Sequence, residues 1–273
     1  MTTTAPPRPE SPPAGPRFGR DFVLMCVVVG GAFVNFGLLA STVPLWAAEG
    51  GSDNAGVGAV TGVMMAATVA SQLCVGLLLR RFSMRQLLAA GAFLMGAPAA
   101  AYLVSADLTW VLGATALRGV GFGFVTVAGA ALVGELVPAA RQGKALATYG
   151  AAVGAPQLVF LPLGLWIVEQ VDFTPVFLAA AATALLVTPL VWTMNGRGAA
   201  APDDVPSDPI TPKGRWLPLA GPGTAMLVVA CGYGGVLTFL PLALSSPAAA
   251  AGALPAMSVA IMAGRWAAGA VSD

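Results

Sequence analysis

The feature that most constrains the fold is a succession of apolar segments, each close to the ~20 residues that an α-helix needs to cross a bilayer. Eight segments follow one another, with predicted bounds 22–47, 57–79, 86–105, 109–134, 143–168, 174–194, 216–243 and 249–270. Only 9% of the residues are charged, against roughly 25% in soluble domains. The sequence therefore predicts an all-α integral membrane protein, with the lipid bilayer as its surroundings.

The segments between these spans predict the domain organisation. Residues 1–20 are rich in Thr, Pro and Ala and are expected to form a disordered cytoplasmic tail. Residues 21–195 hold six spans, which we expect to form one bundle. Residues 196–215 combine acidic residues with several prolines and are typical of a linker. Residues 216–273 hold two spans, which we interpret as the start of a second bundle.

The positions of the charged residues predict the orientation of the chain. Eleven of the thirteen basic residues fall on one side if the loops alternate across the membrane: Arg8, Arg17, Arg20, Arg80, Arg81, Arg85, Arg141, Lys144, Arg197, Lys213 and Arg215. The loops of the other side hold acids: Glu49, Asp53, Asp107, Glu169 and Asp172. Because cytoplasmic loops are enriched in Lys and Arg, we expect a multi-pass protein of the cell (plasma or inner) membrane with a cytoplasmic N-terminus.

An internal repeat relates the first spans to the last ones. The first span has Gly37 and Pro44 at the spacing that Gly234 and Pro241 have in the seventh. The second span ends with Gly76 four residues before Arg80, and the eighth with Gly269 four residues before Asp273. The common order favours two parallel six-helix halves, an arrangement of one large class of transporters.

The loop after the second span resembles the signature loop of a known family. Gly76, Arg81 and Arg85 match the loop signature of the major facilitator superfamily (MFS), whereas Arg80 and Ser83 replace its Asp and Gly. Arg118-Gly119-Val120-Gly121 and Glu135-Leu136-Val137-Pro138 are further similarities. The resemblance covers residues 22–273 and implies an MFS-type bundle. Complete members have twelve helices, so the eight spans favour a C-terminally truncated fragment over a natural eight-span protein.

Arg118 is the sharpest candidate for function, since it lies near the middle of the fourth span. A guanidinium there costs about 2.5–3.5 kcal/mol on insertion scales unless it faces a polar cavity or a partner. The family resemblance implies a part in proton or substrate coupling; the alternative is a structural hydrogen bond between helices. Asn35 and Gln157 are the other mid-span candidates for a substrate or proton pathway, with an interhelical hydrogen bond as the alternative for Asn35.

A second set of candidates concerns conformational change. Gly150, Gly154 and Pro156 in the fifth span resemble a family element associated with antiporting exporters. Glycines four apart allow close helix approach, and proline bends a helix, which predicts a hinge or a seal between halves. In the loop, Arg80 stands where the family has an acid that is thought to hold one conformation. The remaining conformational candidates are Gly76, Arg81, Arg85, Gly269 and Asp273.

Several classes of function are excluded or disfavoured. The chain has no His and no phosphate-binding loop, and its three cysteines lie in apolar runs without ligand spacing. We therefore predict no cofactor, no metal site, no enzymatic activity and no nucleic-acid partner. The glycine-rich run after Arg118 is attributed to helix packing.

The resulting hypothesis is a secondary transporter that works by alternating access and exports a small organic compound in exchange for protons. No carboxylate occupies a mid-span position, since Asp21 and Glu135 lie at inner ends; the proton carrier therefore stays open. Two alternatives also stay open: uptake of a metabolite by symport, and a non-transporting membrane protein.

Overall fold

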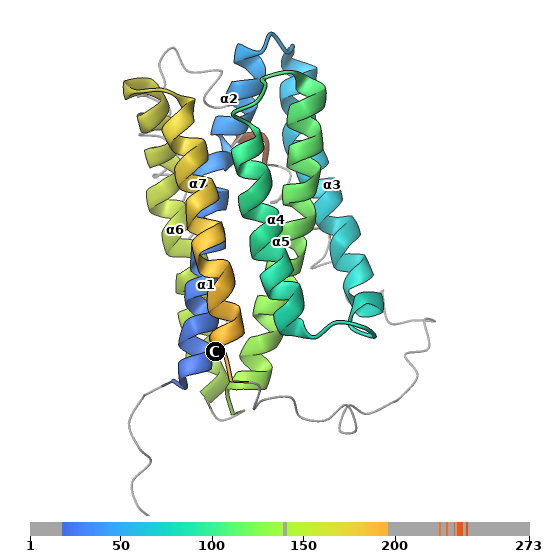
Figure 1. Ribbon diagram of the computed structural model, residues 1–273, viewed down its shortest axis with the longest axis vertical. Helices are drawn as coiled ribbons and strands as arrows, with labels where there is room; N and C mark the ends of the chain where they lie inside the picture. The colour runs from blue at the N-terminus through green and yellow to red at the C-terminus, as the bar shows by residue number, and fades with distance from the viewer. Residues whose placement is uncertain are drawn as a thin grey trace, which may run out of the picture.

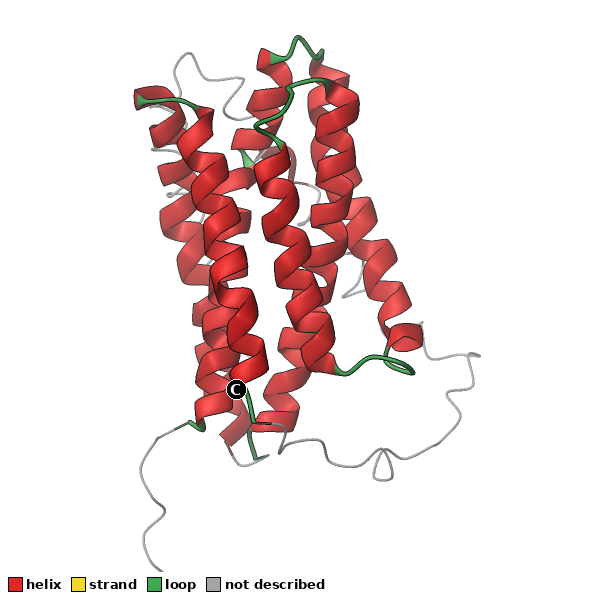
Figure 2. Ribbon diagram, in the orientation of Figure 1, coloured by secondary structure: helices red, strands yellow, loops and turns green. Residues whose placement is uncertain are grey.

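The computed structural model describes residues 18–138 and 141–195, together with seven helical positions at Thr224, Val228, Gly232, Gly234, Gly235, Val236 and Phe239. Figure 2 shows that the long described ranges are helices joined by short loops. The elements are α1 (Arg20–Ala40), α2 (Thr42–Glu49), α3 (Asn54–Leu78), α4 (Met84–Ala101), α5 (Leu108–Leu136), α6 (Gln142–Gln170), α7 (Phe173–Val187) and the 3₁₀ helix η2 (Thr188–Thr193). The tail at 1–17, the linker and most of the last two predicted spans lie outside these residues.

The helices correspond to the six spans predicted for the first bundle. Two spans contain a break, and each break has a proline. The first span is divided at Ser41 into α1 and α2, because Pro44 has no N–H to donate to the carbonyl of Ala40. The sixth tightens from α7 into η2 around Pro189.

Side-chain caps set the starts of three helices. The carboxylate of Asp53 accepts a hydrogen bond from the N–H of Gly56 at 2.8 Å, and Asp107 caps α5 in the same manner. Ser83 and Gln86 form a capping box at the start of α4. Ser83 replaces the glycine of the MFS loop signature, and the cap gives this departure a local structural role.

The order of packing follows from close contacts between backbones (Figure 1). Helix α5 packs between α3 and α4, while α1 packs against α6 and α7. A Cβ on Gly91 or Gly121 would lie 2.7 Å from the other residue's carbonyl oxygen, and one on Gly119 would lie 2.5 Å from the carbonyl oxygen of Met64. The glycines of α5 thus let two helices approach it closely, as the predicted packing role requires.

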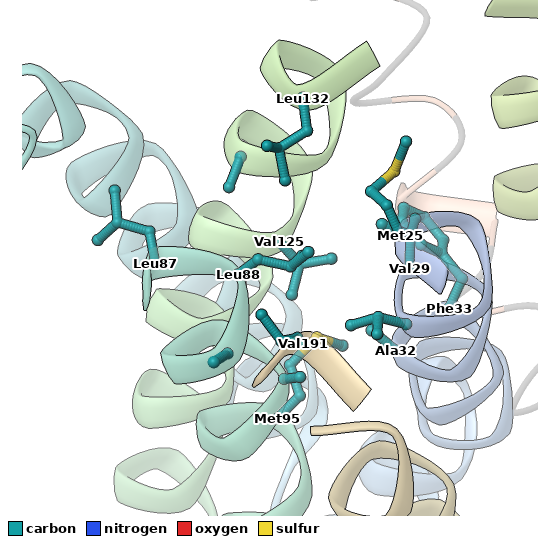
Figure 3. Close-up of a cluster of buried hydrophobic side chains, with 14 of the residues drawn as sticks. Met25, Val29, Ala32, Phe33, Leu87, Leu88, Met95, Val125, Leu132 and Val191 are labelled. Atoms are coloured by element: carbon teal, nitrogen blue, oxygen red, sulfur yellow. The ribbon is translucent and has the colours of Figure 1, made fainter. Parts of the chain in front are cut away.

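The core is divided into two apolar clusters along the bundle axis. The larger cluster joins the first half of α1 to α4, to the second half of α5 and to η2; Figure 3 shows Phe33, Leu88, Met95 and Val125 within it. The other cluster joins the far end of α1 to the start of α5 and to α7. Asn35 on α1 and Arg118 on α5 lie near the positions where each helix passes from one cluster to the other.

The outer surface of the bundle fits a membrane environment. Five segments are long and apolar enough to cross a bilayer: 20–49, 54–78, 108–136, 142–170 and 173–193. The remaining long helix, α4, has 18 residues and is packed against α5 and α7. Large apolar side chains such as Leu73, at 80% exposure, face outward. The described part of the chain is therefore a multi-pass helical bundle in lipid.

Candidate functional site

The centre of the bundle holds a buried cation. Arg118 lies ten residues from the first residue of α5, which is about 15 Å along the helix at ~1.5 Å per residue. Its side chain is only 1% exposed. The Nη2 group donates to Oδ1 of Asn35 at 3.1 Å, and Nη1 donates to the hydroxyl of Tyr102 at 3.3 Å. Both acceptors are neutral, so neither compensates the positive charge.

Asn35 connects four helices at this level. Its Nδ2 group donates to the backbone carbonyl of Ala180 on α7 at 2.8 Å and to that of Met95 on α4 at 3.2 Å. Its carbonyl oxygen is turned to Arg118 on α5. The side chain is completely buried. These contacts are the interhelical hydrogen bonds that the sequence offers as one alternative for Asn35, and a direct contact with substrate stays a prediction.

Tyr102 and Thr115 complete a polar layer with Asn35 and Arg118. The Tyr102 hydroxyl shares a hydrogen bond of 2.8 Å with the Thr115 hydroxyl, and its ring lies beside the Arg118 guanidinium with 5.7 Å from Cζ to the ring centroid. Both side chains are buried. Sequence reasoning missed them. Thr115 lies three residues before Arg118 and hence on the same helical face, which is a signal that could have identified it.

A cavity of about 290 Å³ adjoins this layer. Its lining comes from α1, α2, α3, α5 and α6, with Gly234 from the later described positions. Among the described residues, the polar side chains that line the cavity are Thr61, Thr115, Arg118 and Gln157. The aromatic ones are Phe33, Phe36 and Phe122, and the rings of Phe36 and Phe122 stack with centroids 4.7 Å apart. The guanidinium therefore faces a largely apolar chamber.

Two of the three predicted pathway residues line this cavity. Arg118 and Gln157 do so from α5 and α6, and Gln157 also donates to the carbonyl of Val153 at 3.1 Å. Asn35 is linked to the cavity only through Arg118. The arrangement brings the three candidates together, while their roles in transport stay a prediction.

The loop candidate Arg85 belongs to a separate cluster at the end of the bundle where α1 and α4 begin. Its Nη1 and Nη2 groups donate to the carbonyls of Met194 and Asn195 at 3.1 and 3.0 Å, and Nη2 lies 3.8 Å from a carboxylate oxygen of Asp21. Asp21 also accepts from the backbone N–H of Asn195 at 3.1 Å. The cluster ties the starts of α1 and α4 to the end of the sixth span.

The other loop candidates have few contacts. Arg80 and Arg81 are exposed, and their side chains form no hydrogen bond or ion pair with the residues that the structure describes. A Cβ on Gly76 would meet no atom of the same residues within 4 Å. Gly269 and Asp273, the loop candidates of the second copy, lie outside the described ranges.

The candidate hinge in α6 lies against α1. A Cβ on Gly37 would be 3.4 Å from the carbonyl oxygen of Pro156, so the two helices touch closely at the proline. Gly150 is exposed, and a Cβ there would meet nothing within 4 Å in the described part of the chain. The described neighbour of this element is thus a helix of the same bundle. A role of Gly150, Gly154 and Pro156 between halves stays a prediction.

No group of three or more metal-ligating side chains occurs within ranges 18–138 and 141–195 or the later described positions. Cys26 and Cys74, the cysteines among the described residues, are both free. The chemistry of the polar layer is that of hydrogen bonding and charge, and it suits binding of a small molecule.

The described residues thus form a helical membrane bundle with a cavity that is lined in part by a buried cation. A family model described as Major Facilitator Superfamily matches residues 25–273. The chain therefore belongs to this superfamily, and the family predicted from the loop signature is confirmed.

Among solved structures, the crystal structure of D-xylose-proton symporter is similar, with a TM-score of 0.59 and 17% sequence identity. The match covers 87% of this chain and 65% of the symporter chain. At this identity the likeness shows the fold alone. No curated protein sequence matches the chain.

Proposed function

We propose that the chain is a secondary active transporter that exports a small organic compound by alternating access, with protons as the coupling ion. Membership of the superfamily supports secondary transport. The observation that carries the proposal is the position of Arg118, a buried guanidinium on the wall of a central cavity. A charge at this depth is costly unless it has a function or a partner, and its described partners are neutral.

The proposed route begins in the cavity between α1, α3, α5 and α6. A ligand in the chamber contacts Arg118 and Gln157 directly, while Asn35 and Tyr102 hold the guanidinium in place. Rocking of the bundle against a second half opens the chamber to one side of the membrane at a time. The cytoplasmic N-terminus and the cell-membrane location belong to this proposal, because the basic loops that support them share one end of the bundle.

Export is the favoured direction because Gly150, Gly154 and Pro156 resemble the element of antiporting exporters. Proton coupling needs an acid that changes its charge during the cycle. Within the described spans, Asp21 is engaged with Arg85 and Glu135 is exposed near the inner end of α5. The proton carrier therefore stays open in this proposal.

The test uses the full-length protein in inside-out membrane vesicles with an acidic interior. The probes are naphthalene-1-carboxylate, naphthalene-1-carboxamide, naphthylmethylamine and D-xylose. Accumulation of one probe above the level in vesicles without the protein, which collapses when the pH gradient is removed, is the expected result. Accumulation only in right-side-out vesicles with an inward proton gradient would establish uptake by symport. Movement of no probe in either orientation, with the protein folded, would support a non-transporting protein.

A further inference from the structure

We infer that the central cavity takes a lipophilic organic anion, a small apolar body that carries one carboxylate or similar acidic group. The inference rests on the proposed transport function and names its class of substrate. It is carried by two observations: the described wall of the cavity is apolar and aromatic, and its one charged side chain is a guanidinium with neutral partners.

The apolar wall selects the body of the ligand. Phe33, Phe36 and Phe122 face the chamber, with Met64 and Met65 of α3 beside them. Aromatic and methionine side chains offer a large contact area and adapt to different apolar shapes. The volume of about 290 Å³ is at the lower end of the roughly 300–1,000 Å³ typical of small-molecule pockets. A compact ring system suits this space.

The guanidinium selects the polar end of the ligand. Arg118 donates to Asn35 and Tyr102 through its two Nη groups, and its Nε–H has no acceptor among the described residues. A buried donor without an acceptor and a buried charge without a counter-ion are both unfavourable. A ligand carboxylate supplies an acceptor and a negative charge together, and a carboxylate can accept two parallel N–H groups of an arginine.

The same wall disfavours the other classes of ligand. A cation would lie beside Arg118 with no carboxylate on the described part of the lining. A sugar needs several hydrogen-bonding partners around its hydroxyl groups, whereas Thr61, Thr115, Arg118 and Gln157 are the polar side chains there. A neutral apolar compound would leave the Arg118 charge uncompensated.

An anionic substrate also fits the proposed direction of transport. A negative charge that leaves the cytoplasm moves down the ordinary membrane potential, which is negative inside. The potential thus favours export of the anion without a carboxylate in the described spans. Uptake of the same anion would have to work against it.

The test compares three ligands with one ring system and different charges, in the full-length protein in lipid nanodiscs. Naphthalene-1-carboxylate is expected to bind at least tenfold more tightly than naphthalene-1-carboxamide, and naphthylmethylamine more weakly than both. Empty nanodiscs correct for partition into lipid. In the unaltered protein, equal affinities for the three ligands, or tighter binding of the amide or the amine, would overturn the inference.

Variants assign the preference to Arg118. In Arg118→Gln the carboxylate and the carboxamide should bind within twofold of each other, whereas Arg118→Lys should keep a preference for the carboxylate. Lys144→Gln is the matched control: it also removes one positive charge, but from an exposed position in the first turn of α6, and its affinities should be unchanged. A tenfold preference that persists in Arg118→Gln would contradict the assignment.

Transport assays separate the failure of this inference from failure of the proposed function. If the vesicles accumulate the amine or D-xylose but not the carboxylate, the transporter proposal stands and the substrate class is wrong. If the carboxylate binds with the expected preference but is not moved in either direction, the binding site stands and the transport proposal fails.

Discussion

Two arginines of this bundle each tie several helices together, but they do so in opposite electrostatic settings. Arg85 lies at the end of the bundle where α1 and α4 begin, partly exposed, with the carboxylate of Asp21 and the carbonyls of Met194 and Asn195 as partners. Arg118 lies in the middle, 1% exposed, with an amide and a hydroxyl as partners. The charge of Arg85 is compensated by its own chain, while that of Arg118 is not compensated within the described residues.

The difference leads us to expect a structural role for Arg85 and a functional role for Arg118. The Arg85 guanidinium bonds to carbonyls at the C-terminal end of the sixth span, where the helix dipole favours a cation. Both carbonyls would otherwise lack an intrahelical donor. Arg118 brings a desolvation cost that the folded bundle does not recover from its neutral partners. A residue retained at such a cost is expected to interact with a ligand.

The largest expected effect comes from removing the uncompensated charge. Arg118→Leu should lower transport more than a hundredfold, because loss of one partner of a buried ion pair costs about 3–5 kcal/mol. Its free energy of unfolding should change by about 1 kcal/mol or less. This change is small because two contributions oppose each other: losing the charge-assisted hydrogen bonds lowers the free energy of unfolding, and removing the cost of a charge in the membrane raises it. Vesicle uptake and reversible SDS-induced unfolding measure the two quantities; wild-type uptake would refute a coupling role.

A second variant should give Arg118 a neighbouring carboxylate, as Arg85 has in Asp21. Thr115→Asp places a carboxylate three residues before Arg118 on the same face of α5, at a position that lines the cavity. This internal anion should compensate the guanidinium and lower the affinity for naphthalene-1-carboxylate about tenfold. The carboxamide should be affected less. Thr115→Asn has nearly the same shape without the charge and is the control; an equal loss in both variants would indicate a steric effect.

The third comparison tests the compensated arginine. Arg85→Leu should destabilise the protein by roughly 1–2 kcal/mol, since two charge-assisted hydrogen bonds are lost at a partly solvated site. Transport per folded molecule should stay within a few fold of the unaltered protein. Asp21→Asn, which removes only the carboxylate charge, should cost less than about 1 kcal/mol. A transport loss as large as that of Arg118→Leu would erase the distinction between the two arginines.

The sequence was sufficient to predict the helices of the first bundle, since each span is set by the thickness of a bilayer and by local signals. Apolar length gives the span, and prolines and caps give its ends. The break at Ser41 was not predicted, although Pro44 was noted as part of the repeat. The sequence also did not predict which helices pack against α5. The helix that each glycine faces depends on the packing of the whole bundle.

The site was only partly predictable, for a similar reason. Arg118 was found because a charge in the middle of a span is unusual on its own. Tyr102 is an ordinary residue at the end of a span, and only the fold brings its hydroxyl to the guanidinium. Asn35 was a candidate for a substrate contact or for an interhelical hydrogen bond; the structure shows it buried and hydrogen-bonded to Arg118, and the substrate contact stays a prediction. The sequence identified Arg118 and Asn35 as polar residues in the middle of their spans, but it did not predict which side chains contact each other.

The smallest expected effect concerns Arg80, the residue that replaces the acid of the family's loop signature. Arg80 is exposed at the inner end and its side chain contacts none of the described residues through hydrogen bonds or ion pairs. Arg80→Asp should therefore leave the free energy of unfolding within about 0.5 kcal/mol. It should still shift the balance of inward- and outward-open forms a few fold, by restoring the acid that is thought to hold one conformation. Labelling rates of reporter cysteines on both faces measure this balance, after replacement of the native cysteines.

Lys144→Asp is the matched control for that experiment, because it makes the same charge change at an exposed residue outside the signature loop. If both variants shift the labelling rates equally, the effect is one of surface charge in general. If neither does, the acid position has no conformational role in this chain. A shift confined to Arg80→Asp would add a third kind of arginine to the comparison. Arg85 would then stabilise the bundle, Arg118 would bind the ligand, and Arg80 would influence which side of the membrane the cavity faces.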